Sequence, residues 1–305
     1  MSDDQPANEQ NHSHLRKAIG VGAELVGGAA GGALGFLFAG PIGSAGAGAA
    51  GVVISKTLLA VGDEVCDRIL SPREKARVGA AVAIAADRTQ ERLKHGDQIR
   101  TDSFLSDGTS RPPVDEVTEG LLLAAQKAYE EKKVPFIGRL LANLNFRPDL
   151  NVQSASLLVR LSDQLSYQHL CLLRLCYDNN SSTPLKGGQA GKHVKSPEHA
   201  ALLSDLLYLE RSGFINNGGN AVLGLTDINP PKMQLQLFGS HLFSLMELDR
   251  IPQEDLTGLR AIFDAPDPSY VTTQALNVNL NAPERFTPSP LVGGINIDGI
   301  KETRP

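Results

Sequence analysis

The sequence predicts a mostly α-helical protein with an N-terminal helical hairpin, a helical body, and a small winged-helix-like subdomain that mixes helix and strand. Three observations predict this fold class. Residues 18–61 consist mainly of glycine and alanine. Beyond residue 62, apolar residues recur at helical spacing between recognisable capping residues. After residue 213 the pattern changes to short alternating runs, which are typical of strands.

The composition limits the class of protein and its surroundings. The chain has 305 residues, of which 41% are hydrophobic and 21% charged, and its formal net charge is −5. These values are typical of a folded protein and give no basic excess that would collect nucleic acid. Three cysteines without paired spacing fit a reducing cytosol. The polar, acidic N-terminus is unlike a signal peptide, and we expect residues 1–17 to be disordered.

Small residues dominate the segment 18–61, which we expect to form a glycine zipper. Ten glycines lie between Leu25 and Ser55. A four-residue step stays close to one face of a helix, so small residues at that spacing leave a groove for a second helix, as in membrane helix pairs. The predicted membrane and self-association positions are Gly27, Gly31, Gly35, Ala39, Gly43, Ala47 and Gly51.

The dipeptide Gly40-Pro41 interrupts this segment and predicts the turn of the hairpin. The two legs would be 18–39 and 42–61, each roughly 30 Å long, which matches a bilayer core. Glu24 and Lys56 would then form an ion pair at the membrane face. Basic residues flank both legs, as expected when both ends stay in the cytoplasm. The alternative is a soluble element that packs against the body until it is triggered.

The body, residues 62–178, carries clear helix boundaries. Ser71 precedes Pro72 and Glu74 as a capping box, and His95-Gly96 ends that helix. A second helix is predicted over 115–133, and Pro135 begins another. Asn151 and Ser166 are the predicted N-caps of two further helices.

The order of elements in residues 196–250 predicts the winged-helix-like module. A helix ends at Gly213, and "FINN" and "AVLGLTD" read as a hairpin around Gly218-Gly219, with "MQLQLFGSHLFSLMEL" after it. Residues 251–305 are rich in proline and asparagine and are predicted to form an extended tail.

The sequence contains no motif that predicts catalysis, a cofactor or a metal. "GGQAGKH" lacks the spacing of a phosphate-binding loop. His169, Cys171 and Cys176 lie in an apolar helical run, where core packing is the simpler interpretation. We therefore expect a protein that is not an enzyme.

The charges of the module argue against nucleic acid as its partner. The predicted second helix carries Glu198, Asp205 and Glu210 against Arg211 alone. A recognition helix needs cations or amides that face bases and phosphates. The basic loop residues Lys186, Lys192 and Lys195 are more typical of a solvated loop. The charges favour a protein partner over DNA.

Three short motifs resemble the Abi-alpha family of bacterial abortive-infection proteins: "KKVPFIGRLLANL" (132–144), "LLYLERSGFI" (206–215) and "LQLFG" (235–239), where Gln236 replaces the family's threonine. The resemblance covers about 115–248 and implies a role in phage exclusion or altruistic cell arrest.

Together with the hairpin, the resemblance predicts a non-enzymatic defence or toxin-like protein. It would reside in the bacterial cytoplasm and associate with the inner membrane. Its expected partners are membrane lipid, further copies of itself and a protein trigger. The alternative is a soluble regulator whose module binds a protein or DNA.

Overall fold

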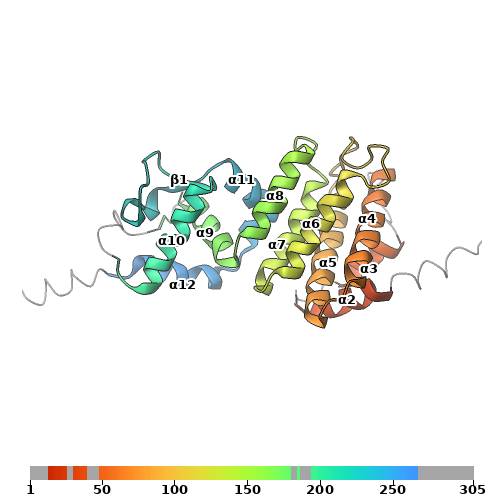
Figure 1. Ribbon diagram of the computed structural model, residues 1–305, viewed down its shortest axis with the longest axis horizontal. Helices are drawn as coiled ribbons and strands as arrows, with labels where there is room; N and C mark the ends of the chain where they lie inside the picture. Colours follow the sequence, from red (N-terminus) through yellow and green to blue (C-terminus); the bar gives the residue numbers. More distant parts are fainter. Residues whose placement is uncertain (1–12, 26–29, 40–47, 180–183, 186–193, 267–305) are drawn as a thin grey trace, which may run out of the picture. The chain divides into compact units, whose positions relative to one another are not determined.

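The computed structural model describes residues 13–25, 30–39, 48–179, 184–185 and 194–266 (Figure 1). The described residues up to Ala265 belong to one compact unit. They contain eleven α-helices and one two-stranded antiparallel sheet, which confirms the prediction of a mostly helical chain with a small strand component. The first seven helices are α2 (Ser13–Leu25), α3 (Ala30–Ala39), α4 (Gly48–Asp67), α5 (Pro72–Lys94), α6 (Pro113–Lys127), α7 (Val134–Leu144) and α8 (Val152–Gln164). The remaining elements are α9 (Tyr167–Asp178), α10 (Pro197–Arg211), β1 (Ile215–Asn217), β2 (Met233–Leu235), α11 (Leu237–Met246) and α12 (Gln253–Asp264).

Helix α5 is the centre of the helical body. Its residues 78–83 are all buried, so the middle of the helix has no solvent-facing side. Helices α2, α3, α4, α6 and α7 all pack on it. The buried positions of α5 are mostly alanine, glycine and valine. Small side chains let several helix backbones approach one axis at once, and this composition therefore produces the layered arrangement seen in Figure 1.

The crossing of α2 and α5 is so close that it needs glycine on both helices. A methyl group on Gly22 would lie 2.5 Å from the carbonyl oxygen of Ala76, and one on Gly79 would lie 2.6 Å from the amide nitrogen of Ile19. These neighbours are backbone atoms and cannot move aside alone. Small residues do bring helices together here, although Gly22 and Gly79 are not among the predicted zipper positions.

The local helix signals in the body are confirmed. Ser71 accepts a hydrogen bond from the Glu74 amide, and the Glu74 side chain accepts one from the Ser71 amide at 2.8 Å. His95 caps the other end of α5, followed by Gly96 in the left-handed region at φ 89°. Asn151 and Ser166 cap α8 and α9 through their side chains.

Several boundaries near the N-terminus differ from the prediction. Residues 13–17 are helical rather than disordered, because Leu15 belongs to the apolar face of α2 and is fully buried. Instead of one leg over 18–39, the chain forms α2 and α3, and the second leg begins at Gly48 and continues to Asp67. The Gly40-Pro41 turn lies outside the described residues.

The helix predicted over 115–133 ends earlier, at Lys127. Ala128 adopts an extended backbone at ψ 102°, and a 3-10 turn (Glu131–Lys133) leads into α7. The reason is a tertiary contact, because the Glu130 carboxylate accepts a hydrogen bond from the Tyr167 amide at the start of α9. A continuous helix would carry Glu130 away from that partner.

The predicted hairpin around Gly218-Gly219 is wrong in its second strand. Strand β1 pairs with β2, with Ile215 opposite Leu235 and Asn217 opposite Met233. The segment "AVLGLTD" forms no strand; part of it is a 3-10 turn (Leu225–Asp227). Asn217 causes this difference, because its side chain donates to the Asp227 carbonyl and accepts from the Asn229 amide, which folds the loop back on itself.

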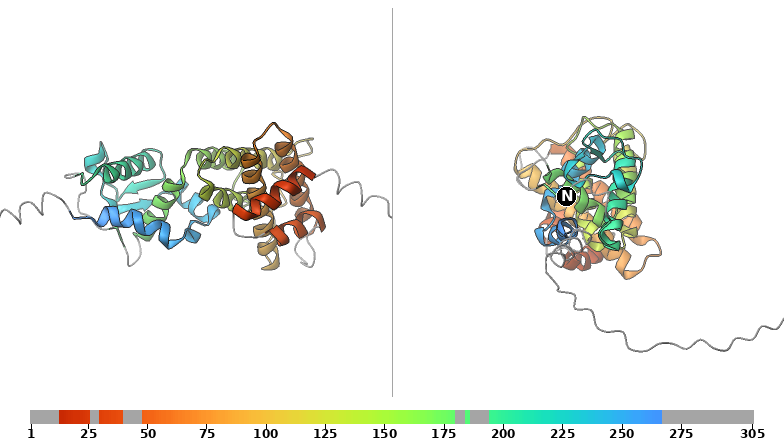
Figure 2. Two further views of the ribbon diagram at one scale, coloured as in Figure 1. Left: turned by 90° about the horizontal axis from the view of Figure 1, so that it is seen from below. Right: turned by 90° about the vertical axis from the view of Figure 1, so that its left-hand side faces the viewer.

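The prediction of an extended tail from residue 251 is wrong for residues 253–264, which form α12. Its Leu256 and Phe263 are buried, and Figures 1 and 2 show α12 beside α9 and α10, with which it makes contact. The Tyr167 hydroxyl donates to Asp255 at 2.8 Å. Residues 267–305 of the predicted tail lie outside the described part of the chain.

The α2–α5 crossing can be tested with two glycines of the same helix. We expect Gly22→Ala to lower the free energy of unfolding by about 1–2 kcal/mol, because overpacking against backbone outweighs the better helix propensity of alanine. Gly20→Ala is the matched control, because nothing lies within 4 Å of a methyl group there. It should raise stability by up to about 1 kcal/mol. Urea unfolding followed by circular dichroism measures both, and equal effects would contradict the crossing.

Candidate functional site

The predicted zipper positions are distributed over two helices and two segments that the structure does not describe. Gly31, Gly35 and Ala39 lie in α3, and Gly51 is buried in α4. Gly35 is exposed, and no atom lies within 4 Å of where its side chain would begin. Gly27, Gly43 and Ala47 lie outside the described residues. The described residues therefore show no helix seated on Gly35, and its role in self-association stays a prediction.

Helix α3 is composed only of alanine, glycine, leucine and phenylalanine, so none of its side chains can form an ordinary hydrogen bond. Ala33, Phe36 and Leu37 are buried in the common core, while Leu34 and Phe38 are half-buried. The Arg16 guanidinium lies 4.9 Å from the centre of the Phe38 ring. Apolar packing and this cation–π contact are the side-chain interactions that hold α3 on the body.

Helix α4, in contrast, is held by polar contacts along its C-terminal half. The Thr57 hydroxyl donates to Asp115 of α6 at 2.9 Å, and Arg68 forms an ion pair with Glu119. The Asp63 carboxylate accepts a hydrogen bond from the Leu15 amide of α2 at 3.4 Å. The uncharged residues 48–55 of α4 precede these contacts. The segment predicted as a hairpin thus has an apolar part followed by a polar anchor.

Glu24 and Lys56 are both exposed, and no ion pair joins them within the described residues. Their pairing at a membrane face stays a prediction. Among the helices that the structure describes, none combines the length and apolar content needed to cross a bilayer.

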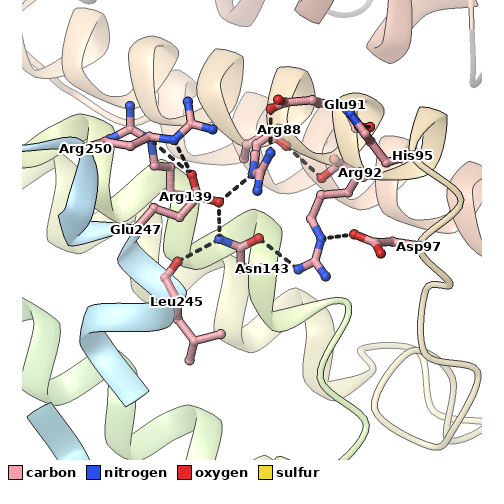
Figure 3. A network of polar contacts seen from close by, with 12 residues as sticks. Arg88, Glu91, Arg92, His95, Asp97, Arg139, Asn143, Leu245, Glu247 and Arg250 are labelled. Carbon is pink, nitrogen blue, oxygen red and sulfur yellow. Dashed lines mark hydrogen bonds and ion pairs between the residues drawn. The ribbon is translucent and has the colours of Figure 1, made fainter. Parts of the chain in front are cut away.

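A polar cluster that the sequence did not predict lies where α5 and α7 meet the end of α11 (Figure 3). Glu247 is its centre and is mostly buried. Its Oε1 accepts hydrogen bonds from Arg88 Nε at 2.5 Å and from Asn143 Nδ2 at 3.0 Å. Its Oε2 lies 2.9 Å from Arg250 Nε and 3.8 Å from Arg139 Nε. One carboxylate therefore faces three guanidinium groups.

Backbone geometry places Glu247 in this position. It is the one non-glycine residue with positive φ in the described chain, at φ 54° and ψ 54°, where it ends α11. Such a conformation is unfavourable for most residues and persists where surrounding contacts determine it. The ion pairs of Glu247 are the contacts that do so.

Asn143 and Arg92 extend the cluster toward solvent. The Asn143 amide nitrogen also donates to the Leu245 carbonyl at 2.9 Å, and its oxygen accepts from Arg92 at 3.0 Å. Arg92 in turn pairs with Asp97 at 2.7 Å and lies over the Phe146 ring. Burial lowers the pKa of Arg139, and the charge of Glu247 opposes that effect.

The ion pairs of this cluster form a structural clasp between α5, α7 and the end of α11. It borders an open cavity of about 390 Å³, but each arginine lining that cavity already pairs with a carboxylate. No serine, cysteine or lysine nucleophile in it is paired with a base. A signal was present in the sequence, because Arg139 and Asn143 stand four residues apart on one face of an otherwise apolar helix.

His169, Cys171 and Cys176 serve helix capping and packing. His169 Nδ1 accepts a hydrogen bond from the Ser166 amide, and its ring stacks on Tyr208. Cys171 and Cys176 are buried in the core. Within the described residues, no group of three histidine, cysteine, aspartate or glutamate side chains is placed to hold a metal ion.

Two basic residues in and next to the C-terminal module have structural partners. Lys195 Nζ donates to the carbonyl oxygens of Phe263 and Ala265 at 2.7 and 2.6 Å, where it caps the end of α12. Arg211 donates to the Leu223 carbonyl in the loop after β1. Lys186 and Lys192 lie outside the described residues. Lys195 and Arg211 are therefore engaged with backbone oxygens, Arg250 pairs with Glu247, and Lys232 is exposed.

The glycines of the three family-like motifs have architectural roles. A side chain on Gly138 would meet the Ala81 carbonyl of α5 at 2.8 Å, and one on Gly239 would overlap the Phe214 carbonyl. Gly213 has φ 77°, in the left-handed region. The glycines of these motifs thus specify helix packing and chain reversal.

No protein-family model matches the chain, and neither a curated protein nor a solved structure matches it significantly.

The clasp can be tested by removing the charge of Glu247. We expect Glu247→Gln to lower the free energy of unfolding by about 3 kcal/mol, because Arg139 and Arg250 lose this carboxylate and Arg88 keeps only the more exposed Glu91. Asp149→Asn is the control, because it removes an exposed pair with Arg147 and should cost less than about 1 kcal/mol. Chemical unfolding of both variants measures the difference, and two equal losses would show that Glu247 is no clasp.

The cysteines should be unreactive in the folded protein. Burial raises the pKa of Cys66, Cys171 and Cys176 to about 12, so at about pH 8 the reactive thiolate is scarce. We expect iodoacetamide to label none of them in the native state and all three in denaturant, as counted by mass spectrometry. Rapid labelling of one native thiol would contradict its burial.

Proposed function

We propose that the chain is a non-enzymatic bacterial defence protein of the abortive-infection kind, which acts on the inner membrane through its uncharged N-terminal segment. The observation that carries this proposal is the composition and attachment of α3. Its ten residues have no polar side chain, and it is held on the body by apolar contacts and one cation–π contact.

Because α3 is attached by apolar contacts, contacts with lipid can replace those that it makes with the body. Residues 25–55 contain no charged side chain, and the acyl region of a bilayer is as apolar as the core that α3 leaves. The polar contacts of Thr57, Asp63 and Arg68 would keep the C-terminal half of α4 on the body. The segment could then leave the body without unfolding the helices that carry it.

Self-association through the zipper positions would complete the inserted state. Gly35 is open to solvent, so a second copy could approach it. In lipid, small residues at four-residue spacing allow close helix pairing, which the small side chains of 27–51 would provide. In this inserted state, both flanks of the segment would stay in the cytoplasm. Glu24 would then pair with Lys56 at the membrane face.

The alternative is a soluble regulator that binds a partner through its C-terminal module. Two large apolar side chains there are exposed, Leu223 in the loop after β1 (85%) and Leu237 at the start of α11 (67%). These favour a protein partner over DNA. In the first proposal, the same surface would receive a protein trigger.

The variant Gly35→Lys should impair membrane insertion while the body still folds, so it tests insertion separately from folding. The folded body should accept it, because the site is open and lysine favours a helix more than glycine does. A charge in the middle of an inserted segment costs about 2.5–3.5 kcal/mol, so we expect dye release from vesicles of bacterial lipid to fall roughly a hundredfold. Growth arrest on expression should weaken in parallel.

Two variants complete the design. Gly35→Ala keeps the segment apolar, and Gly258→Lys adds the same charge at another exposed, open helical position in α12. Both should release dye as the parent chain does. Membrane action would be contradicted if Gly35→Lys released as much dye as the parent chain. It would also be contradicted if the parent chain neither released dye nor stayed with the membrane.

A further inference from the structure

A pocket of about 360 Å³ lies between α2, the start of α5 and the connection from α4 to α5. Its volume is within the range of small-molecule sites. Val21 and Leu70 contribute apolar surface, and Ala18 and Ala76 line it further in. Lys17, Lys75 and His14 supply basic groups around this apolar surface, and no acidic residue is among the described residues that line it.

The lysines of this pocket differ from most cations of the body. Arg68, Arg73, Arg88 and Arg92 each pair with a carboxylate. The side chains of Lys17 and Lys75 make no ion pair or hydrogen bond within the described residues.

The acidic residue nearest to Lys75 in sequence is already engaged. The Glu74 carboxylate accepts hydrogen bonds from the Ser71 amide and from Gln126. Its hydrogen bonds to Ser71 and Gln126 hold the pKa of Glu74 at about 2, so it stays ionised in this cap. The Glu74 carboxylate is therefore occupied by these two partners and forms no ion pair with Lys75.

Exposed apolar side chains adjoin the same pocket. Ile69 is fully exposed directly before Leu70, and Val21 is half exposed on α2. Basic groups next to exposed aliphatic side chains are typical of surfaces that lie in the headgroup region of an anionic membrane.

We propose that this pocket, bounded by His14, Lys17, Val21, Leu70 and Lys75, binds an anionic phospholipid. Lys17 and Lys75 would contact the phosphate of the headgroup, and the apolar surface of Val21 and Leu70 would cover the first acyl carbons. This inference rests on the proposed membrane action and names its lipid class. It also places the recognition site on α2, which leads directly into the uncharged segment that begins at Leu25.

The test is a calorimetric titration of the full chain with short-chain phosphatidylglycerol, kept below its micelle concentration. No bilayer is present, so the result is independent of insertion. We expect saturable binding, weaker binding of short-chain phosphatidylcholine, and a loss of about fivefold in affinity for each of Lys17→Gln and Lys75→Gln. Lys94→Gln is the matched control, an exposed lysine at the other end of α5, and should bind as the parent chain does.

Three results would overturn the proposal: no saturable binding by the parent chain, unchanged binding by the Lys17→Gln/Lys75→Gln double variant, and inorganic phosphate binding as tightly as the lipid. The last would identify a plain anion site. If the lipid binds but Gly35→Lys does not reduce dye release, the pocket stands and the insertion proposal fails. If dye release depends on Gly35 but no lipid binds, the pocket alone is rejected.

Discussion

The burial of α5 around its whole circumference is the constraint on which the rest of the helical body depends. A helix with no solvent-facing side in its middle can be surrounded only if its own side chains are small, and residues 78–83 are valine, glycine and alanine. The close crossing at Gly22 and Gly79 follows from this, as does the contact of Gly138 with the Ala81 carbonyl. Close packing then supplies the dispersion contacts that large side chains provide in other cores.

The same packing explains how an uncharged, glycine-rich segment can be part of a folded body. Helix α3 covers the small-residue surface of α5 without forming side-chain hydrogen bonds. Its attachment therefore depends on apolar burial, which a bilayer can also satisfy, whereas α4 is fixed by Thr57 and Arg68. This contrast between an apolar part and a polar anchor supports a segment that moves while the body stays folded.

The clasp around Glu247 connects the C-terminal module to this body. Glu247 draws on arginines from α5, α7 and the turn after α11, and Asn143 adds a hydrogen bond to the α11 backbone (Figure 3). Buried ion pairs contribute little net stability but cost much when broken, so they define one arrangement of the parts they join. Leu237, one of the two exposed leucines of the module, begins α11, and Glu247 ends it. A partner that binds Leu223 and Leu237 would therefore contact the helix that carries the clasp carboxylate. The pocket proposed to bind phospholipid lies at another part of the body, on α2, so lipid binding and partner binding could occur together.

The sequence by itself determined the features that depend on neighbouring residues. The caps at Ser71, Asn151 and Ser166, the stop at His95-Gly96 and the helical periodicity of the body are local interactions, and the structure contains each of them. Only the tertiary structure decided which surfaces meet. The partner of β1, the end of α6 at Lys127, the helix α12 and the carboxylate of Glu247 all depend on residues far away in the chain. The small residues of 18–61 show the division most clearly. Their spacing indicates that a helix backbone can come close but does not say which one, and the close α2–α5 crossing uses Gly22 and Gly79, which are not predicted zipper positions.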